Sequence, residues 1–199
     1  MDLGNGVNKE QRLQRTKSEA EEAVRVLLEY LGEDPSRDGL SETPERVVRA
    51  WTEYCAGYWS DPATILKQTF ENPEKYSEPV VLRNISFVSH CEHHLAPING
   101  FVDVAYVPSE RIVGISKIAR VVECFSRRLQ TQETMTAQIA NCIQDNLMPA
   151  GTAVKSRATH ACMTNRGVCK SGTLMTATTF TGVFLSDLAL KHQFLNGQI

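Results

Sequence analysis

The strongest constraint on the fold of this chain is a set of metal-ligand side chains that lie far apart in the sequence. Cys91 and His94 form one short pair, and Cys162 stands alone much later in the chain. Structural zinc sites close their tetrahedron with four protein ligands, whereas catalytic sites use three and leave the fourth position to water. The sequence therefore predicts a fold that brings these two segments together around one catalytic zinc ion per subunit.

The composition is that of an ordinary globular protein. The chain has 199 residues, 42% of them hydrophobic, which is enough for one core with a helical appendage. A formal net charge of −2 provides no overall basic field, so we expect no nucleic acid partner. The longest apolar runs are shorter than the roughly 20 residues that cross a bilayer, so we expect no membrane partner either.

The cysteine content indicates a reducing compartment. The chain contains six cysteines, and Met1 to Ala20 lacks the charged and then apolar pattern of a signal segment. Free thiols are therefore favoured over disulfide bonds, and we expect the protein to be cytoplasmic.

The first part of the chain is predicted to be helical. Residues 1–17 are polar and are expected to be a mobile segment, and residues 18–75 form the predicted N-terminal helical region. Ser18 and Glu21 have the spacing of a capping box at the start of one helix. Thr43, followed by proline, begins a second helix, with a short third helix after it.

Residues 76–199 are predicted to form an α+β catalytic domain. Period-two alternation and helical spacing give the order β-β-α-α-β-β and then a closing helix. The expected elements are strands Val80–Val88 and Phe101–Val107, a helix capped by Ser116, a helix through Met135–Leu147, strands Val154–Cys162 and Leu174–Phe184, and a helix from Ser186 onward. His160 and Cys162 would then share one face of a strand and could serve one site.

Four strings in this chain carry a resemblance to a known family. They are Ser89-His90-Cys91-Glu92-His93-His94, Gly114-Ile115-Ser116-Lys117-Ile118-Ala119-Arg120, Ser126-Arg127-Arg128-Leu129-Gln130-Thr131-Gln132-Glu133 and Thr159-His160-Ala161-Cys162-Met163-x-x-Arg166-Gly167. In this order they closely resemble GTP cyclohydrolase I, from about Thr43 to Phe184. The resemblance implies a tunnelling fold, in which an antiparallel four-stranded sheet carries two helices on one side. It also implies a homodecamer of two pentameric rings, with each site shared between neighbouring subunits.

The resemblance implies a hydrolytic reaction on GTP. Zinc held by Cys91, His94 and Cys162 would supply hydroxide that attacks C8 of guanine, and the ring would open with loss of formate. The product would be 7,8-dihydroneopterin triphosphate, and the reaction would be the first step toward tetrahydrofolate or another pterin. His93 and His160 are then the candidate general acid and base. Their alternative role is a hydrogen bond that orients a ligand or water.

Further residues are candidates for binding GTP. Ser116, Lys117 and Arg120 lie at the start of a predicted helix, where cations and free N–H groups can hold phosphate oxygens, and Arg166 would complete this set. Taken singly, each cation has a simpler interpretation as a solvated surface charge.

Guanine has its own candidate residues. Glu133, helped by Gln132, can accept hydrogen bonds from guanine N1–H and the 2-amino group, which adenine cannot offer. The alternative for Glu133 is a first-turn glutamate favoured by the helix dipole. Thr134 stands where relatives commonly carry arginine, so a cation beside this pair is missing.

Three other kinds of protein share some of these features. A zinc nucleobase deaminase needs Pro-Cys-x-x-Cys, and no Cys-x-x-Cys occurs in the chain. Another tunnelling-fold enzyme, such as a nitrile reductase acting on a deazaguanine, would use a cysteine nucleophile without zinc. A zinc-stabilised assembly module without activity would need further ligands to close the coordination sphere.

Overall fold

The computed structural model describes residues 15–72 and 74–199, and the chain divides into two compact units. The first unit runs to Ala56 and the second from Gly57 to Ile199. This division falls earlier in the chain than the predicted domain boundary after residue 75. Gly57 is tied to the second unit by the hydrogen bond that its N–H donates to the carbonyl of Arg127 at 2.9 Å. Of the predicted mobile segment 1–17, residues 1–14 lie outside the described residues.

The first unit contains the two predicted helices, α1 (Lys17–Tyr30) and α2 (Thr43–Tyr54). The predicted capping box at Ser18 is wrong, because Thr16 is the N-cap of α1. The Thr16 hydroxyl accepts from the Glu19 N–H at 3.2 Å, and the Glu19 carboxylate accepts from the Thr16 N–H at 2.7 Å. Both pairs fit the same sequence pattern, and helix α1 uses the pair that begins two residues earlier in the chain.

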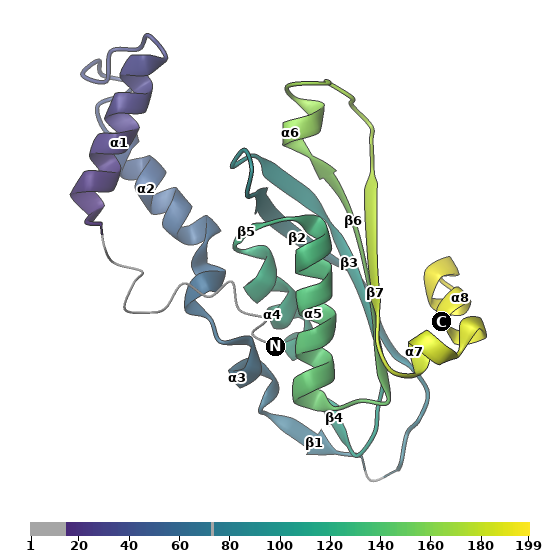
Figure 1. The fold of residues 1–199 in the computed structure, drawn as a ribbon. Helices are drawn as coiled ribbons and strands as arrows, with labels where there is room; N and C mark the ends of the chain where they lie inside the picture. The colour runs from purple at the N-terminus through teal and green to yellow at the C-terminus, as the bar shows by residue number, and fades with distance from the viewer. Residues whose placement is uncertain (1–14, 73) are drawn as a thin grey trace. The chain divides into compact units, whose positions relative to one another are not determined.

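The remaining chain forms a mixed α/β unit (Figure 1). Its elements are η1 (Ala56–Trp59), α3 (Pro62–Leu66), β1 (Thr69–Glu71), β2 (Val80–Cys91), β3 (Pro97–Val107), β4 (Arg111–Val113), α4 (Ile115–Ser126), β5 (Leu129–Gln130), α5 (Gln132–Leu147), β6 (Gly151–His160), α6 (Ala161–Thr164), β7 (Met175–Phe180), α7 (Val183–Ser186) and α8 (Leu188–Asn196).

The main sheet has the strand order β5-β2-β3-β6-β7. Strands β2, β3, β6 and β7 are antiparallel neighbours, which confirms the predicted four-stranded sheet and its α+β tunnelling-fold arrangement. The added strand β5 pairs in parallel with the end of β2, through Cys91 and Gln130. Two residues are too few to show a periodicity, so this strand could not be predicted from the sequence.

Two apolar clusters cover the two faces of the sheet. Helices α4 and α5 lie along one face, and α7 and α8 lie against the other (Figure 1). Consecutive strand residues alternate between the clusters, so that Val104 packs under α4 and α5 while Ala105 packs with Phe184 and Phe194. One face of the sheet is therefore covered along its length by α4 and α5, whereas α7 and α8 cover the other face only toward the Val107 end of β3, and Val88 and Phe101 stay exposed on it.

Several predicted boundaries in the second unit are wrong. Helix α4 begins at Ile115 with Gly114 as its N-cap, so Ser116 does not cap it. Strand β6 ends at His160, and Cys162 lies in the following helix α6. The prediction that His160 and Cys162 share one face of a strand is therefore wrong. Strand β7 ends at Phe180, because Gly182 turns the chain into α7.

Gly182 occupies a backbone conformation that requires glycine. Its φ of 53° and ψ of −132° lie in a region that L residues rarely adopt, and a Cβ would meet the Ala150 carbonyl oxygen at 2.0 Å. We expect Gly182→Ala to lower the free energy of unfolding by at least about 1–3 kcal/mol, measured by urea denaturation. Gly197→Ala is the control, because φ is 74° there but no atom lies within 4 Å of the added Cβ. Equal losses at both positions would contradict the steric argument.

Within residues 15–72 and 74–199, no helix combines the length and apolar character that crossing a membrane requires.

Candidate metal centre

The end of strand β2 and the turn after it present the first two predicted ligands. Cys91 is the last residue of β2, and His94 lies in the turn that leads into β3. The turn is held closed because the Cys91 N–H donates to the Ala96 carbonyl and the Leu95 N–H donates to the Cys91 carbonyl, both at 2.8 Å. Cys91 Sγ lies 4.0 Å from His94 Nδ1. The local backbone therefore brings a thiol and an imidazole together.

Helix α6 supplies the third ligand. The ligand atoms of Cys91, His94 and Cys162 all lie within 4.8 Å of one another. Cys91 is buried, Cys162 is half-buried and His94 is exposed, so the group opens to solvent on one side. The structure thus brings together the three residues that the sequence predicted as ligands.

The geometry and chemistry of this group fit a zinc ion. Ligand atoms bound to zinc at about 2.0–2.3 Å with tetrahedral angles lie about 3.3–3.8 Å apart, so small shifts would complete the site. Two thiolates with an imidazole are a ligand set that zinc prefers. Burial and the adjacent Cys91 raise the pKa of the Cys162 thiol. A cation between the two sulfur atoms would favour their deprotonated forms.

The register of the sheet places His160 beside this group. His90 pairs with Pro97 across β2 and β3, and Ile98 pairs with His160 across β3 and β6. Strands β2 and β6 therefore finish at the same end of the sheet, on either side of β3, and α6 follows directly after His160 (Figure 1). The catalytic role of His160 stays a prediction, but its side chain comes from the strand end that also leads to Cys162.

Gln132 has surroundings that the sequence did not indicate. Its side chain is buried, and its Oε1 lies 2.8 Å from Nε2 of His160. Its Nε2 donates to Ser156 Oγ at 2.9 Å and to the Met175 carbonyl at 3.2 Å. The amide is therefore fully engaged within the chain. One sequence signal points to this contact, because Ser156 and His160 lie on the same face of β6 by strand alternation.

Glu133 lies next to Gln132 in the first turn of α5, but its side chain is exposed. The Thr131 hydroxyl caps this helix by accepting from the Thr134 N–H at 3.2 Å. Burial lowers the pKa of His160, and the charge of Glu133 acts in the opposite direction by raising it. A carboxylate free to meet a ligand therefore stands close to His160.

His93 lies in the same turn as His94 and is exposed. Its Nδ1 is 3.8 Å from Cys91 Sγ, and its Nε2 is 3.7 Å from Glu92 Oε1. The ring is therefore close enough to the candidate metal group to act on a water molecule there. Its assignment as acid or base, or as an orienting residue, stays a prediction.

The residues predicted to hold phosphate lie on two separate elements. Ser116 and Arg120 are exposed and Lys117 is half-buried in the first turns of α4, whose N-terminus has no side-chain cap. Arg166 follows α6, and its charge favours the thiolate of Cys162. Among the described residues, none of the three α4 side chains makes a hydrogen bond or ion pair with the metal group or His160. The structure thus links Arg166 to the Cys162 thiol, while the place of Ser116, Lys117 and Arg120 in a phosphate site stays a prediction.

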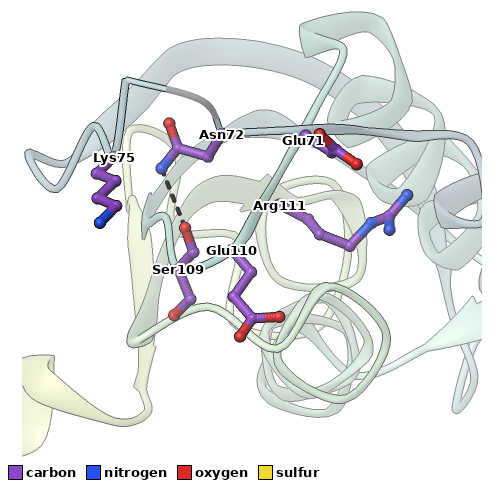
Figure 2. A pocket seen from close by; sticks show the side chains of 6 residues that line it. All are labelled: Glu71, Asn72, Lys75, Ser109, Glu110 and Arg111. Atoms are coloured by element: carbon purple, nitrogen blue, oxygen red, sulfur yellow. Dashed lines mark hydrogen bonds between the residues drawn. The ribbon is translucent and has the colours of Figure 1, made fainter.

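A surface pocket of about 660 Å³ lies elsewhere in the second unit (Figure 2). It is lined by residues that flank β1 and β4: Glu71, Asn72, Lys75, Ser109, Glu110 and Arg111. The Asn72 amide donates to the Ser109 carbonyl at 3.0 Å across it. Because Ser109 follows the Val107 end of β3, whereas Cys91 and His94 come just before its Pro97 end, the two features lie at opposite ends of the sheet.

Comparison with known proteins identifies the family. The profile described as GTP cyclohydrolase I matches residues 20–198. A GTP cyclohydrolase 1 from Hyphomonas neptunium is 54% identical over 91% of this chain and 88% of its own length. The enzyme from Maricaulis maris is 53% identical over 90% of this chain and 88% of its own, and that from Rickettsia massiliae is 50% identical over 91% and 95%. Because the profile and these relatives cover nearly the whole chain, the chain belongs to the GTP cyclohydrolase I family.

Proposed function

We propose that this protein is a zinc-dependent GTP cyclohydrolase I that converts GTP and water to formate and 7,8-dihydroneopterin triphosphate. This reaction would be the first step toward tetrahydrofolate or another pterin cofactor. The observation that carries the proposal is the group of Cys91, His94 and Cys162, whose ligand atoms lie within 4.8 Å in a chain of this family.

The ligand set has the character of a catalytic site. Zinc bound by three protein ligands keeps an open position and lowers the pKa of a bound water to about 7. The exposed side of the group at His94 leaves room for that water and for the substrate. Within the described residues, no fourth His, Cys, Asp or Glu belongs to the group, which argues against a closed structural site.

Two further histidines, His93 and His160, would move protons during ring opening. His160 can donate to the purine nitrogen as the bond from C8 breaks, because its ring lies at the strand end beside the metal group. His93, with its ring 3.8 Å from Cys91 Sγ, can accept a proton from the attacking water. Each transfer needs a group that changes protonation near neutral pH, and imidazole is suited to this.

Charged side chains would hold the two ends of GTP. Glu133, exposed and close to His160, can accept from guanine N1–H and the 2-amino group. Lys117 and Arg120, with Ser116 and the uncapped start of α4, would bind the triphosphate, together with Arg166. Because the α4 residues form no hydrogen bond or ion pair with the metal group within the described part of the chain, they would be available to the site of a neighbouring subunit.

A ring-shaped oligomer would provide that neighbour. Strand β7 pairs with β6 on one side, and its other edge has no strand partner in the part of the chain that the structure describes. On the opposite side of the sheet, β5 is only two residues long, so that most of the outer edge of β2 has no strand partner among the described residues. Two open edges favour sheet pairing between subunits, in keeping with a homodecamer of two pentamers. Native mass spectrometry of the purified chain tests this assembly.

Metal removal and replacement test the proposed chemistry. We expect a chelator to remove one zinc per chain and to stop formate release from GTP, with both restored by added Zn²⁺ but not by Mg²⁺, which prefers oxygen ligands. Full turnover by protein that contains no metal would contradict the proposal.

Glu133→Gln is expected to weaken GTP binding. The change replaces one carboxylate oxygen by an amino group that faces the donors of guanine, and a hydrogen bond to a charged group is worth about 1.5–3 kcal/mol. The KM for GTP should therefore rise about tenfold or more, measured by steady-state kinetics. Glu123→Gln is the matched control, because this exposed carboxylate pairs with Arg127 on α4 and lies in neither candidate set. An unchanged KM in Glu133→Gln would exclude the base-reading role.

A further inference from the structure

We propose that Gln132, Ser156 and Thr136 form a directional hydrogen-bond network that fixes neutral His160 in the tautomer protonated on Nε2, so that Nδ1 is the ring nitrogen that takes up a proton from water and then donates it in catalysis. Gln132 is then a positioning residue that acts through His160. The role of Nδ1 in turnover rests on the proposed function, whereas the tautomer itself rests on the geometry alone.

The orientation of the Gln132 amide follows from its two partners other than His160. The nitrogen lies 3.2 Å from the Met175 carbonyl, which can only accept a hydrogen bond. If the amide were turned over, its oxygen would face this carbonyl oxygen in a buried place, with the Gln132 side chain only 1% exposed. The amide oxygen therefore faces His160 Nε2 at 2.8 Å, and that ring nitrogen must donate.

The hydroxyl groups behind the amide support the same direction. Thr136 Oγ1 lies 2.7 Å from the Gln132 carbonyl, so the Thr136 hydroxyl proton is used there. Ser156 Oγ, 2.7 Å from Thr136 Oγ1, must then donate to Thr136. This leaves the lone pairs of Ser156 Oγ free to accept from the Gln132 amide at 2.9 Å. Each hydroxyl proton has one acceptor, and each acceptor faces a donor.

Because the network is buried, its hydrogen bonds have no alternative partners. Ser156 and Thr136 are 0% exposed, so water cannot replace a partner that turns away. The other neutral tautomer of His160 would place a lone pair against the Gln132 oxygen and leave both atoms without a proton between them. An unsatisfied buried pair of this kind lowers the population of that tautomer by about tenfold or more.

The network also changes the role predicted for Gln132 in binding guanine. Both its amide oxygen and its amide nitrogen already have partners within the chain. Contact with the base would require breaking at least one of these buried hydrogen bonds. Glu133, which is exposed, is then left to bind the base without help from the Gln132 side chain.

Two pairs of variants test the network in zinc-loaded protein. Gln132→Met should lower kcat by about 10- to 100-fold, with zinc content and the KM for GTP unchanged. The expected loss is smaller than the about 10²–10⁴-fold rate contribution of a positioned acid or base, because His160 itself is still present. Gln144→Met is the matched control. Gln144 also bridges α5 to β6 and to the residue after β7, because its Oε1 accepts from the Thr152 and Thr181 hydroxyls, but it lies about 18 Å further along the helix. It should keep the wild-type kcat.

The second pair changes a residue that does not contact His160. Thr136→Val removes the hydroxyl from the network and should also lower kcat, whereas Thr136→Ser restores the hydroxyl and should recover most of the activity. Loss of kcat in Thr136→Val without recovery in Thr136→Ser would indicate a packing effect and overturn the network.

A spectroscopic measurement separates this inference from the proposed function. Solid-state NMR of zinc-loaded protein labelled with ¹⁵N and ¹³C in histidine, assigned with His160→Ala, should show His160 protonated on Nε2, and this signal should be lost or mixed in Gln132→Met. Wild-type protein with His160 protonated on Nδ1, or Gln132→Met with wild-type kcat, would overturn the inference. If wild-type protein shows the Nε2–H signal but does not turn over GTP, the tautomer stands and the proposed function falls.

Discussion

Cys162→Ala is expected to lose both bound zinc and GTP turnover while the chain still folds. Two ligands cannot hold the ion as tightly as three, and even indirect partners of a metal commonly contribute about 10- to 100-fold to affinity or activity. We therefore expect activity to fall by more than about 100-fold. Metal analysis and formate release measure the two effects in one preparation.

The fold should survive this change because Cys162 contributes little to the core. It is half-buried in the four-residue helix α6 and only packs against the edge of the main apolar cluster. Urea denaturation should give nearly the same midpoint for the variant and for metal-free wild-type protein. Cys55→Ala is the control, because it also removes a half-buried thiol but Cys55 is not one of the three residues of the ligand group. Zinc-free Cys162→Ala with full activity would refute the mechanism.

His160→Ala is expected to keep zinc but to lose most of its kcat. A positioned general acid or base contributes about 10²–10⁴-fold to rate, and alanine cannot replace it. Because His160 is not among the three ligands, metal analysis should still give one zinc per chain. Steady-state kinetics with GTP should therefore show a fall in kcat of this size.

The matched control for this variant is His192→Ala. His192 is exposed on α8, which packs on the opposite face of the sheet from α4 and α5. Its loss should leave kcat unchanged. If His160→Ala instead loses zinc and activity together, or retains wild-type kcat, its assignment as a proton-transfer residue is wrong.

The sequence predicted long elements well because each long element repeats its own signal. Strands β2 and β3 carry enough alternating residues to show a period of two, and α5 carries several turns of apolar residues at helical spacing. The predicted order of strands and helices was confirmed for this reason. Strand β5 could not be predicted because it has only two residues and is defined only by its pairing with β2.

Helix starts were less predictable because several residues satisfy the same capping pattern. Thr16 and Ser18 each precede a glutamate by three residues, and only the folded backbone selects Thr16. Ser116 is a good capping residue by type, yet α4 begins after Gly114, whose φ of −60° and ψ of 134° are extended. Capping preferences are worth about 1 kcal/mol, which tertiary packing easily exceeds.

Some features of the candidate site could be predicted from the sequence and others could not. Cys91, His94 and Cys162 could be predicted because metal ligands are few in kind and their spacing is informative. The surroundings of Gln132 could not, because its partners Ser156, His160 and Met175 come from two strands far along the chain. A hydrogen bond between distant segments leaves no local pattern in the sequence.

The most direct test of the central claim is the incubation of purified, zinc-loaded protein with GTP, with pterin absorbance and formate measured in the same tube and ATP as the control substrate. The account predicts a pterin product and one formate per GTP consumed, with neither product from ATP. Zinc-loaded, oligomeric protein that releases no formate from GTP would contradict it.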